Sequence, residues 1–557
     1  MAAKIVVVAI AVMVCMVSGK DYCMPHQSCW PNAETIEKFD NSFTTKANVL
    51  TPDLGPWFWL ACTMKNTYQQ RKPGMVVTAR TTEDVQKAVL FANEHNIRIT
   101  VASSGHCYVG RPAEDGSLLI NLGAMIAMEI KTNVPTLSDT GAIAIVQPAV
   151  TNAVIHNSVS AAGYLAPAGS CPTVAMGGFL IGGGHSPNTR SLGLGADNLI
   201  AATMVLADGA IAELSESGTV TTDRDGQVRS TPDADLFWAI RGGGGAFGVV
   251  TQYTVKLHEA NPGFTSLICA YPFNSVVGSD IYAEDILTHY FLNTLPIMDN
   301  YWSGYLLIST GIPNPQGSRT PGKVVFALLH NGKADEAARA QVQPLVDYRP
   351  DWTTGKECSF KDYANFWEYQ QYVNDPTGFP IAIDNRLQQP EFLTREFAAE
   401  MTRLMYDAAG RGDEYVVVSC TAAHVGGMTS VGRNETAVSD YLHDAVFSST
   451  CGALMNKNYG EDRILRFFSD EWYPMMKKYG RGVYYNEPGF DIPDYAEEFW
   501  GPKYDRLLEI KKKYDPNNAF NCNQCVGWEK VTNGSGYRFS YTKNVIFLLA
   551  FVAALVV

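Results

Sequence analysis

Hydrophobic residues recur at two spacings in the first part of the chain, and the two spacings predict different elements. Between Thr81 and His95 the apolar residues lie three and four positions apart, which is the spacing of an amphipathic helix, and Thr81 and Asp84 are placed as its N-terminal cap. Apolar and polar residues then alternate from Ile97 to Val101, as in a strand. A loop of serine and glycine follows at residues 103–110. His106 is therefore expected on a loop that leaves a strand.

The pattern farther along the chain predicts a mixed α and β fold in two domains. A strand-like run at 249–257 closes the first domain, for which we expect residues 20–260, and further runs at 323–329 and 415–420 fall in a second domain at 261–481. Near the C-terminus, Trp500, Tyr504, Leu507 and Leu508 lie at helical spacing until Asp515-Pro516 end the helix. Residues 482–530 are expected to return to the first domain.

The second domain is rich in aromatic residues. Aromatic rings can form platforms for sugar rings or flat organic substrates, and they can equally well fill an ordinary core. We interpret this domain as the one that faces the substrate, and both roles stay open for each ring. The residues are Trp302, Tyr305, Trp352, Tyr363, Trp367, Tyr369 and Tyr372.

Both ends of the chain carry apolar runs that indicate targeting segments. Lys4, an apolar run and small residues up to Gly19 have the order of a secretory signal peptide at residues 1–19. The last apolar run, 545–557, follows a polar spacer and small residues, the order of a GPI-attachment signal at 531–557. Both runs are shorter than the ~20 residues of a membrane-spanning helix. We predict a secreted, extracellular protein that contacts the cell membrane through a lipid anchor only.

Composition and charge exclude some classes of protein. Hydrophobic residues make up 46% of the 557 residues, which argues against wholesale disorder. The 43 Lys and Arg are outnumbered by 56 Asp and Glu, for a formal charge of −13. Nucleic-acid binding needs clustered basic residues, so a nucleic-acid partner is not expected.

Cysteine usage agrees with an oxidising compartment. Of 12 cysteines, Cys15 leaves with the signal peptide, and the remaining 11 cannot all pair. Cys522 and Cys525 form a CxxC motif without a second pair nearby, which favours a disulfide over zinc, and we predict no metal site. Glycosylation sequons begin at Asn434 and Asn533.

Glycine-rich runs indicate places where backbone approaches a ligand closely. They lie at 177–178, 182–184 and 242–245, and glycine lets backbone N–H groups reach an anion such as a pyrophosphate. The runs do not have the spacing of a dinucleotide fingerprint, so a nicotinamide site is not supported.

Four separated segments together resemble one family. They are SSGHCYVG at 103–110, PAGSCPTVAMGGFLIGGGH at 167–185, DLFWAIRGGGGAFGVVTQYTVKL at 235–257 and the stretch that begins YYNEPGF at 484–520. The chain resembles the berberine bridge enzyme-like group of the vanillyl-alcohol oxidase/p-cresol methylhydroxylase (PCMH) flavoproteins. The resemblance implies an α+β fold: a two-part PCMH-type FAD-binding domain and an α/β substrate domain with an antiparallel sheet covered by helices.

The resemblance also implies FAD held by two covalent bonds. His106 matches the histidine linked to the 8α carbon of the flavin, and Cys171 matches the cysteine linked to its C6. Setting Cys171 aside leaves ten cysteines, enough for five disulfides. Cys107 departs from the family pattern, and it can either pair in a disulfide or crowd the tether.

Further FAD contacts are implied without covalent bonds, and for the glycines a turn-forming role is the alternative. The matching residues are Ser104, Gly105, Gly177, Gly178, Gly182, Gly183, Gly184, Asp197, Asn198, Val250 beside the adenine, and Asn486.

The catalytic base is expected in the family's Tyr-x-Asn-Tyr motif, which here reads Tyr484-Tyr485-Asn486-Glu487. The last position departs from the family, so the base stays open between Glu487 and Tyr484. Val174 matches a position that gates oxygen in relatives, where valine accompanies oxidases. Reoxidation by O2 to H2O2 is therefore expected.

These expectations combine into a leading function with two alternatives. The leading one is a carbohydrate oxidase that takes a mono- or oligosaccharide and converts a hydroxyl group to a lactone. The alternatives are an oxidase or dehydrogenase of a small alcohol or secondary metabolite, and a surface flavoprotein without turnover.

Overall fold

A computed structural model gives the fold of the chain. The residues it describes are 21–44, 48–62, 66, 71–273, 283–311, 320–349, 355–371, 373, 381–410, 417–454 and 461–528. The signal-peptide and GPI-signal predictions, and the sequon at Asn533, lie outside these residues. Within them, no helix combines the length and the apolar character needed to cross a bilayer.

The region that is expected to bind FAD, which we call the FAD-binding region, has two parts, and the first is a small, mostly parallel sheet. Its strand order is β1 (Val49–Leu50), β2 (Met75–Thr78), β4 (Leu118–Asn121) and β3 (Ile99–Ala102), with β1 antiparallel. Helix α3 (Thr82–Glu94) begins at the capping box of Thr81 and Asp84 and buries Val85, Ala88, Val89 and Ala92. The predicted helix is confirmed, and so is the strand that precedes the loop of His106.

The second part is an antiparallel sheet of seven strands. Its order is β11 (Val228–Thr231), β10 (Gly218–Thr222), β9 (Ile211–Ser215), β8 (Leu199–Val205), β12 (Val249–Lys256), β6 (Ala142–Val146) and β5 (Met128–Thr132). Helices α4 (Asn152–Ala161), α5 (Met176–Ile181) and α7 (Asp235–Ile240) share a core with it. The FAD-binding region is thus built in two parts, as expected.

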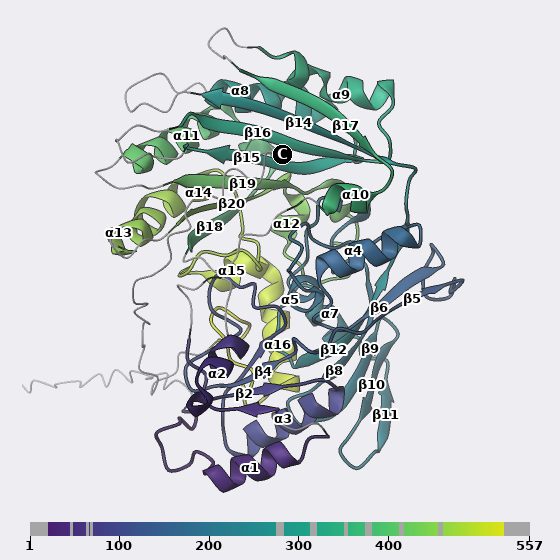
Figure 1. The fold of residues 1–557 in the computed structure, drawn as a ribbon, viewed down its shortest axis with the longest axis vertical. Coiled ribbons are helices and arrows are strands. Elements are labelled where there is room, and N and C mark those ends of the chain that lie inside the picture. The colour runs from purple at the N-terminus through teal and green to yellow at the C-terminus, as the bar shows by residue number, and fades with distance from the viewer. Residues whose placement is uncertain are drawn as a thin grey trace, which may run out of the picture.

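The substrate region is a seven-stranded antiparallel sheet. Its order is β17 (Glu357–Tyr363), β14 (Phe264–Phe273), β16 (Gly322–Asn331), β15 (Trp302–Ser309), β19 (Val418–His424), β20 (Phe447–Leu454) and β18 (Ile381–Gln388). Helices α8 (Ala283–His289), α9 (Glu336–Asp347) and α11 (Arg395–Gly410) cover one face, and the FAD-binding region lies on the other side (Figure 1). The expected helix-covered antiparallel sheet is confirmed.

The C-terminal segment returns to the FAD-binding region (Figure 1). The Ile99 backbone N–H donates to the Ala519 carbonyl oxygen at 3.0 Å, and the Lys511 ammonium donates to the Ala246 carbonyl oxygen at 2.7 Å. The predicted end of the helix at Asp515-Pro516 is confirmed, but the helix is not continuous from Trp500: α15 (Tyr495–Trp500) has Gly501 as its C-cap, a 3-10 helix covers Gly501–Lys503, and α16 (Tyr504–Tyr514) follows. Gly501 has a positive φ of 53°, which breaks the helix.

Shorter elements complete the fold. They are α1 (Ala33–Asn41), α2 (Pro56–Ala61), α6 (Thr189–Leu192), α10 (Phe366–Gln370), α12 (Asp440–Asp444), α13 (Glu461–Arg466), α14 (Tyr473–Lys478) and the paired strands β7 (Tyr164–Leu165) and β13 (His258–Glu259).

Four disulfides form among the 11 described cysteines, one fewer than the five that the cysteine count allowed. The pairs are Cys23–Cys29, Cys269–Cys358, Cys420–Cys451 and Cys522–Cys525. Two of them staple neighbouring strands of the substrate sheet, because Cys269 faces Cys358 and Cys420 faces Cys451 across antiparallel pairs. Cys62, Cys107 and Cys171 belong to none of the four.

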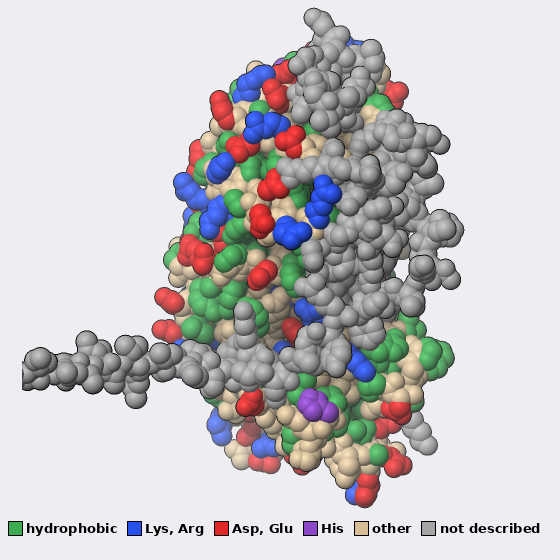
Figure 2. Space-filling view, turned by 90° about the vertical axis from the view of Figure 1, so that its left-hand side faces the viewer, with side chains coloured by type: hydrophobic (Ala, Val, Ile, Leu, Met, Phe, Trp, Pro, Cys, Tyr) green, Lys and Arg blue, Asp and Glu red, His purple; other side chains and the backbone are tan. Residues whose placement is uncertain are grey.

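The described surface on the face shown in Figure 2 intersperses acidic and basic side chains. The net negative charge is therefore not gathered into one acidic field on that face.

Candidate active site

A cavity of about 510 Å³ lies between the FAD-binding region and the substrate sheet. Its size falls in the usual range for ligand sites, roughly 300–1,000 Å³. Its lining comes from loops after β3 and before α5, from the start of β12, from β15 and β18 to β20, and from the C-terminal segment. Segments far apart in the sequence therefore meet at one site.

Two of these segments bring His106 and Cys171 to the cavity. The His106 Nε2 and Thr173 Oγ1 atoms lie 2.7 Å apart, and the Ser104 hydroxyl oxygen accepts the Ala175 N–H at 3.0 Å. The Cys171 carbonyl oxygen accepts the Asn152 side-chain amide at 2.9 Å. The two loops are therefore hydrogen-bonded to each other, and both His106 and Cys171 line the same cavity.

One side of the cavity is built largely from backbone, and we call it the glycine wall. Its members are Ser103, Ser104, Gly105, Gly177, Gly178, Gly245, Gly248 and Val250. A Cβ added at Gly178 would meet no protein atom within 4 Å, whereas one at Gly177 would come within 2.9 Å of the Ser103 hydroxyl. Exposed backbone without side chains suits a long, flat cofactor with a pyrophosphate, so the residues present fit FAD.

Five predicted FAD contacts are not among the residues that line the cavity. Asn198 donates to the carbonyl oxygens of Leu192 and Leu194 at 2.9 and 2.7 Å, and Asp197 accepts the Leu194 N–H at 2.9 Å. These hydrogen bonds stabilise the turn at 192–198, and the Asn198 side-chain oxygen lies 2.6 Å from the His258 Nε2. The five residues are Gly182, Gly183, Gly184, Asp197 and Asn198.

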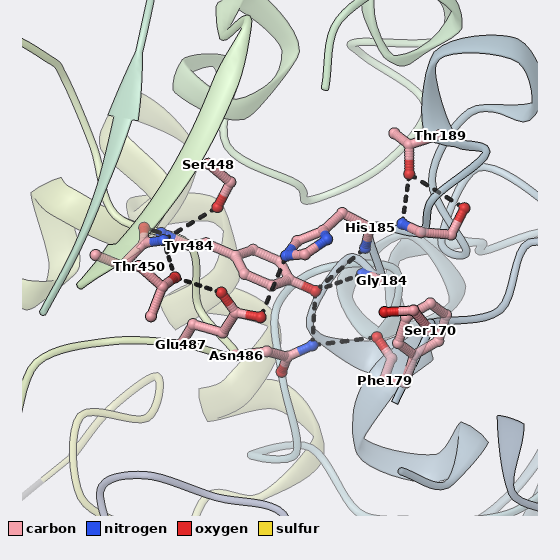
Figure 3. Close-up of polar contacts among 12 residues, drawn as sticks. Ser170, Phe179, Gly184, His185, Thr189, Ser448, Thr450, Tyr484, Asn486 and Glu487 are labelled. Carbon is pink, nitrogen blue, oxygen red and sulfur yellow. Dashed lines mark hydrogen bonds and ion pairs between the residues drawn. The ribbon is translucent and has the colours of Figure 1, made fainter. Parts of the chain in front are cut away.

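Tyr484 lines the cavity, and its hydroxyl oxygen accepts hydrogen bonds from three neighbouring N–H groups (Figure 3). The hydroxyl oxygen accepts hydrogen bonds from the Gly184 N–H at 2.9 Å, the His185 N–H at 3.3 Å and the Asn486 side-chain amide at 3.0 Å. Burial raises the pKa of Tyr484 well above its ordinary value. A neutral phenol anchored in this way is a poor proton acceptor.

Glu487 lies beside Tyr484 and presents its carboxylate to the cavity (Figure 3). One carboxylate oxygen, Oε1, is 3.2 Å from the His185 Nε2, and the other accepts a hydrogen bond from the Thr450 hydroxyl. Burial alone would raise the pKa of Glu487, but the contacts with His185 and Thr450 outweigh it and hold the pKa below its ordinary value. These contacts therefore favour the ionised form of Glu487, whose side chain is 27% exposed.

His185 is a site residue that sequence reasoning missed. It lines the cavity and pairs with Glu487. The sequence did contain a signal for it: His185 directly follows the glycines at 182–184 and ends the segment 167–185, which carries the family resemblance.

The opposite side of the cavity is a sheet surface, which we call the strand wall. Alternate residues of β19 face alternate residues of β20, so that Ala423, Thr421 and Ser419 pair with Ser448, Thr450 and Gly452. Ile381 and Ile383 of β18 continue this surface, and all eight residues line the cavity. The wall is mostly small and carries several hydroxyl groups.

Of the seven aromatic residues predicted for the substrate region, Tyr305 lines the cavity among those described. Its hydroxyl group is 2.8 Å from the Ser170 hydroxyl. Trp302 is fully buried and donates to the Ala338 carbonyl oxygen, so its role is core packing. Tyr363 and Tyr369 pack against each other, Trp367 lies in α10, and Trp352 and Tyr372 lie outside the described residues.

Both loops that reach the cavity are fastened to the substrate region. The Asn66 side-chain amide donates to the carbonyl oxygens of Tyr108 at 2.9 Å and Ile381 at 3.0 Å. The Gln370 side-chain amide donates to the carbonyl oxygen of Ser170, the neighbour of Cys171. The loop of His106 is thereby coupled to the strand wall through Ile381, and the loop of Cys171 is coupled to α10.

The fold and the cavity define an FAD-dependent flavoprotein, and comparisons with known proteins agree. Residues 73–215 match the family model of the FAD binding domain, and residues 483–527 match that described as berberine and berberine like. An uncharacterised FAD-linked oxidoreductase from Arthroderma benhamiae is 30% identical over 479 residues, 82% of this chain and 78% of that protein. The chain belongs to the berberine bridge enzyme-like FAD-linked oxidoreductases of the vanillyl-alcohol oxidase (VAO) type.

Solved structures show the same fold at lower identity. The VAO-type flavoprotein MtVAO713 from Myceliophthora thermophila C1 has a TM-score of 0.77 at 24% identity, over 92% of this chain and 97% of that one. A glucooligosaccharide oxidase from Acremonium strictum, described with 6-S-cysteinyl, 8α-N1-histidyl FAD, has a TM-score of 0.66 at 20% identity, over 86% and 97% of the two chains.

Proposed function

We propose that the protein is a secreted FAD-dependent oxidase of a hydroxyl group, with Glu487 as the base. Bound FAD would supply a two-electron acceptor that takes the hydride from the carbon bearing the hydroxyl and then reduces O2 to H2O2. Glu487 takes the hydroxyl proton, so that the substrate leaves as a carbonyl compound. The observation that carries the proposal is the Glu487 carboxyl group, which lies 3.2 Å from His185 and lines the cavity between the glycine wall and the strand wall.

FAD is proposed to be tethered through His106 and Cys171. Support comes from the hydrogen bond between His106 and Thr173, two residues from Cys171, and from the two-link flavin named for the glucooligosaccharide oxidase. Val174 lines the cavity three residues after Cys171 and is the proposed oxygen gate.

Glu487 is preferred to Tyr484 as the base on electrostatic grounds. A general base must be deprotonated at the working pH. The pKa of Glu487 is below its ordinary value, while burial raises that of Tyr484. Tyr484 acts instead as a support for the backbone of Gly184 and His185.

The proposed substrate is a mono- or oligosaccharide, oxidised at its C1 hydroxyl group to a lactone. The strand wall supports this choice, because the hydroxyl groups of Ser419, Thr421 and Ser448 can hydrogen-bond a polyol. An alcohol of secondary metabolism is the alternative, favoured by the fact that Tyr305 alone of the described candidate aromatics lines the cavity.

Secretion and a lipid anchor remain part of the proposal. Four disulfides among the described residues suit an oxidising compartment, and Asn434 of the first sequon is exposed.

The test measures H2O2 release by the purified holoenzyme on a panel of oligosaccharides and, separately, of simple and secondary-metabolite alcohols. Anaerobic bleaching of the flavin absorption then follows hydride transfer alone on the best substrate. Glu487→Gln should slow bleaching by about 10²- to 10⁴-fold, the usual contribution of a general base. The control Glu94→Gln, at an exposed helix end, should bleach as the wild type does. Bleaching of Glu487→Gln at the wild-type rate would remove Glu487 from the mechanism.

A further inference from the structure

We propose that His185 is the positioning residue of the reaction: it holds the Glu487 carboxylate ionised and aimed into the cavity from behind. This inference rests on the proposed function and adds a residue to it. Its starting observation is the 3.2 Å contact between the His185 Nε2 and the Glu487 Oε1.

The two side chains differ in their access to the cavity. The Glu487 side chain is 27% exposed and that of His185 is 10% exposed. Both ring nitrogens of His185 are closed off from solvent, and apart from the 3.2 Å ion-pair contact of Nε2 with Glu487 neither has a hydrogen-bond partner among the described residues. A substrate hydroxyl group therefore meets the carboxylate first, and the imidazole acts through it.

His185 is itself held by the glycines that precede it. Gly183 and Gly184 have positive φ values of 115° and 77°, which turn the chain sharply just before His185. The Gly184 and His185 N–H groups donate to the Tyr484 hydroxyl oxygen, and the His185 and Tyr484 rings lie 4.7 Å apart. These glycines thus aim the histidine, which explains why they do not line the cavity.

The other groups around Glu487 do not replace the histidine. Thr450 donates one hydrogen bond to the carboxylate and carries no charge. Tyr484 and Tyr305 feel the charge of Glu487, but burial raises the pKa of each phenol, so both stay neutral. Among the described neighbours, His185 is the titratable group that can oppose the burial of the carboxylate.

The consequence is a shift in pH dependence. Without His185, burial raises the pKa of Glu487, and the carboxylate becomes protonated at a higher pH. Bleaching needs the ionised carboxylate, so the rate should fall at a higher pH than in the wild type. At a pH well above the raised pKa of Glu487, the bleaching rate of the His185 variant should return to that of the wild type.

The experiment measures kcat/KM for anaerobic bleaching against pH, using the best substrate of the panel. His185→Phe keeps a ring but removes the donor, and His185→Gln keeps a donor without an ionisable group. We expect the acid limb to move up by one pH unit or more in His185→Phe, by less in His185→Gln, and not at all in the exposed control His26→Gln.

Retained colour after acid precipitation shows that each variant still carries its flavin. An unshifted acid limb in a coloured His185→Phe enzyme would overturn the inference while leaving Glu487 as the base. If His185→Phe does not fold, an unshifted limb in His185→Gln overturns it equally. Wild-type bleaching by Glu487→Gln would instead overturn the proposed function, so the two failures are distinguishable.

Discussion

The glycine wall and the strand wall face the same cavity but are built by different means. The glycine wall consists mostly of backbone, from the loop after β3, the start of α5 and the segment that enters β12, and the loop after β3 is fixed to the segment before α5 by a local hydrogen bond. The strand wall consists of side chains that reach the cavity because three strands pair in one register. A wall of backbone accepts one fixed cofactor, whereas a wall of side chains can change its chemistry one residue at a time.

The largest effect tests the cofactor side of this comparison. The double variant His106→Ala/Cys171→Ala should lose all colour from the acid-precipitated protein, because both proposed covalent links are gone. Each single variant should keep a coloured pellet through the remaining link. Colour that survives in the double variant would place the attachment at other residues.

The next effect tests what holds the two walls together. Arg386 of β18 and Glu498 of α15 form a buried ion pair with a 2.7 Å contact. Glu498→Gln leaves the Arg386 charge buried without its partner, so the free energy of unfolding should fall by about 3–5 kcal/mol in urea titrations. Glu34→Gln breaks an exposed ion pair with Lys38 and should cause no measurable change.

The same pair predicts a pH dependence of stability. Burial would raise the pKa of Glu498, but Arg386, Lys477 and Tyr473 together hold it below its ordinary value. The contribution of the pair is then fully present above the unfolded pKa of about 4.3 and is lost as the pH falls through the folded pKa. The stability difference between wild type and Glu498→Gln should therefore shrink in acid, and a constant difference would argue against an ionised Glu498.

A smaller effect distinguishes a glycine that lines the cavity, Gly178, from a glycine that packs against the protein behind it, Gly182. A Cβ at Gly182 would collide with the Asn486 carboxamide, so Gly182→Ala should lower the free energy of unfolding by about 1–3 kcal/mol through overpacking. A Cβ at Gly178 meets no protein atom, so Gly178→Ala should keep the stability of the cofactor-free protein and lower FAD loading instead. Thermal unfolding and flavin absorbance measure the two responses. If both variants changed stability and FAD loading to the same extent, the two glycines would not have different roles.

The smallest effect tests the strand wall. Thr421→Val replaces a hydroxyl group by a methyl group of similar size, and it should raise KM for a hydroxylated substrate by about 5- to 10-fold, the value of one hydrogen bond. The flavin content and kcat should stay close to those of the wild type. An unchanged KM would mean that Thr421 does not contact the substrate.

The two walls also differ in how far the sequence predicts them. The loop of His106 and the glycines at 177–178 lie in short segments whose residues carry their own signal, and both line the cavity. The strand wall has no such segment, because its face depends on the pairing of Thr421 with Thr450 and of Ile383 with Gly452. Register is set by the whole sheet rather than by any local run of residues.

The remaining misses have equally physical causes. Trp302 was a candidate platform for a substrate because it is aromatic, but its side chain lies in the core. The type of a residue does not say which face of a strand it occupies. The glycines at 182–184 gave a signal for backbone freedom, and Gly183 and Gly184 use that freedom to turn the chain before His185. Gly501 interrupts the helical pattern near the C-terminus, where the spacing of Trp500 and Tyr504 continues across a break.

The span of the cavity lining also determines when the pocket can exist. Its residues run from Asn66 to Cys522, so the site cannot assemble until Cys522 has been translated. Cofactor capture must follow that point, and a message with a premature stop before Tyr484 yields a polypeptide that keeps His185 but lacks Glu487, the proposed base.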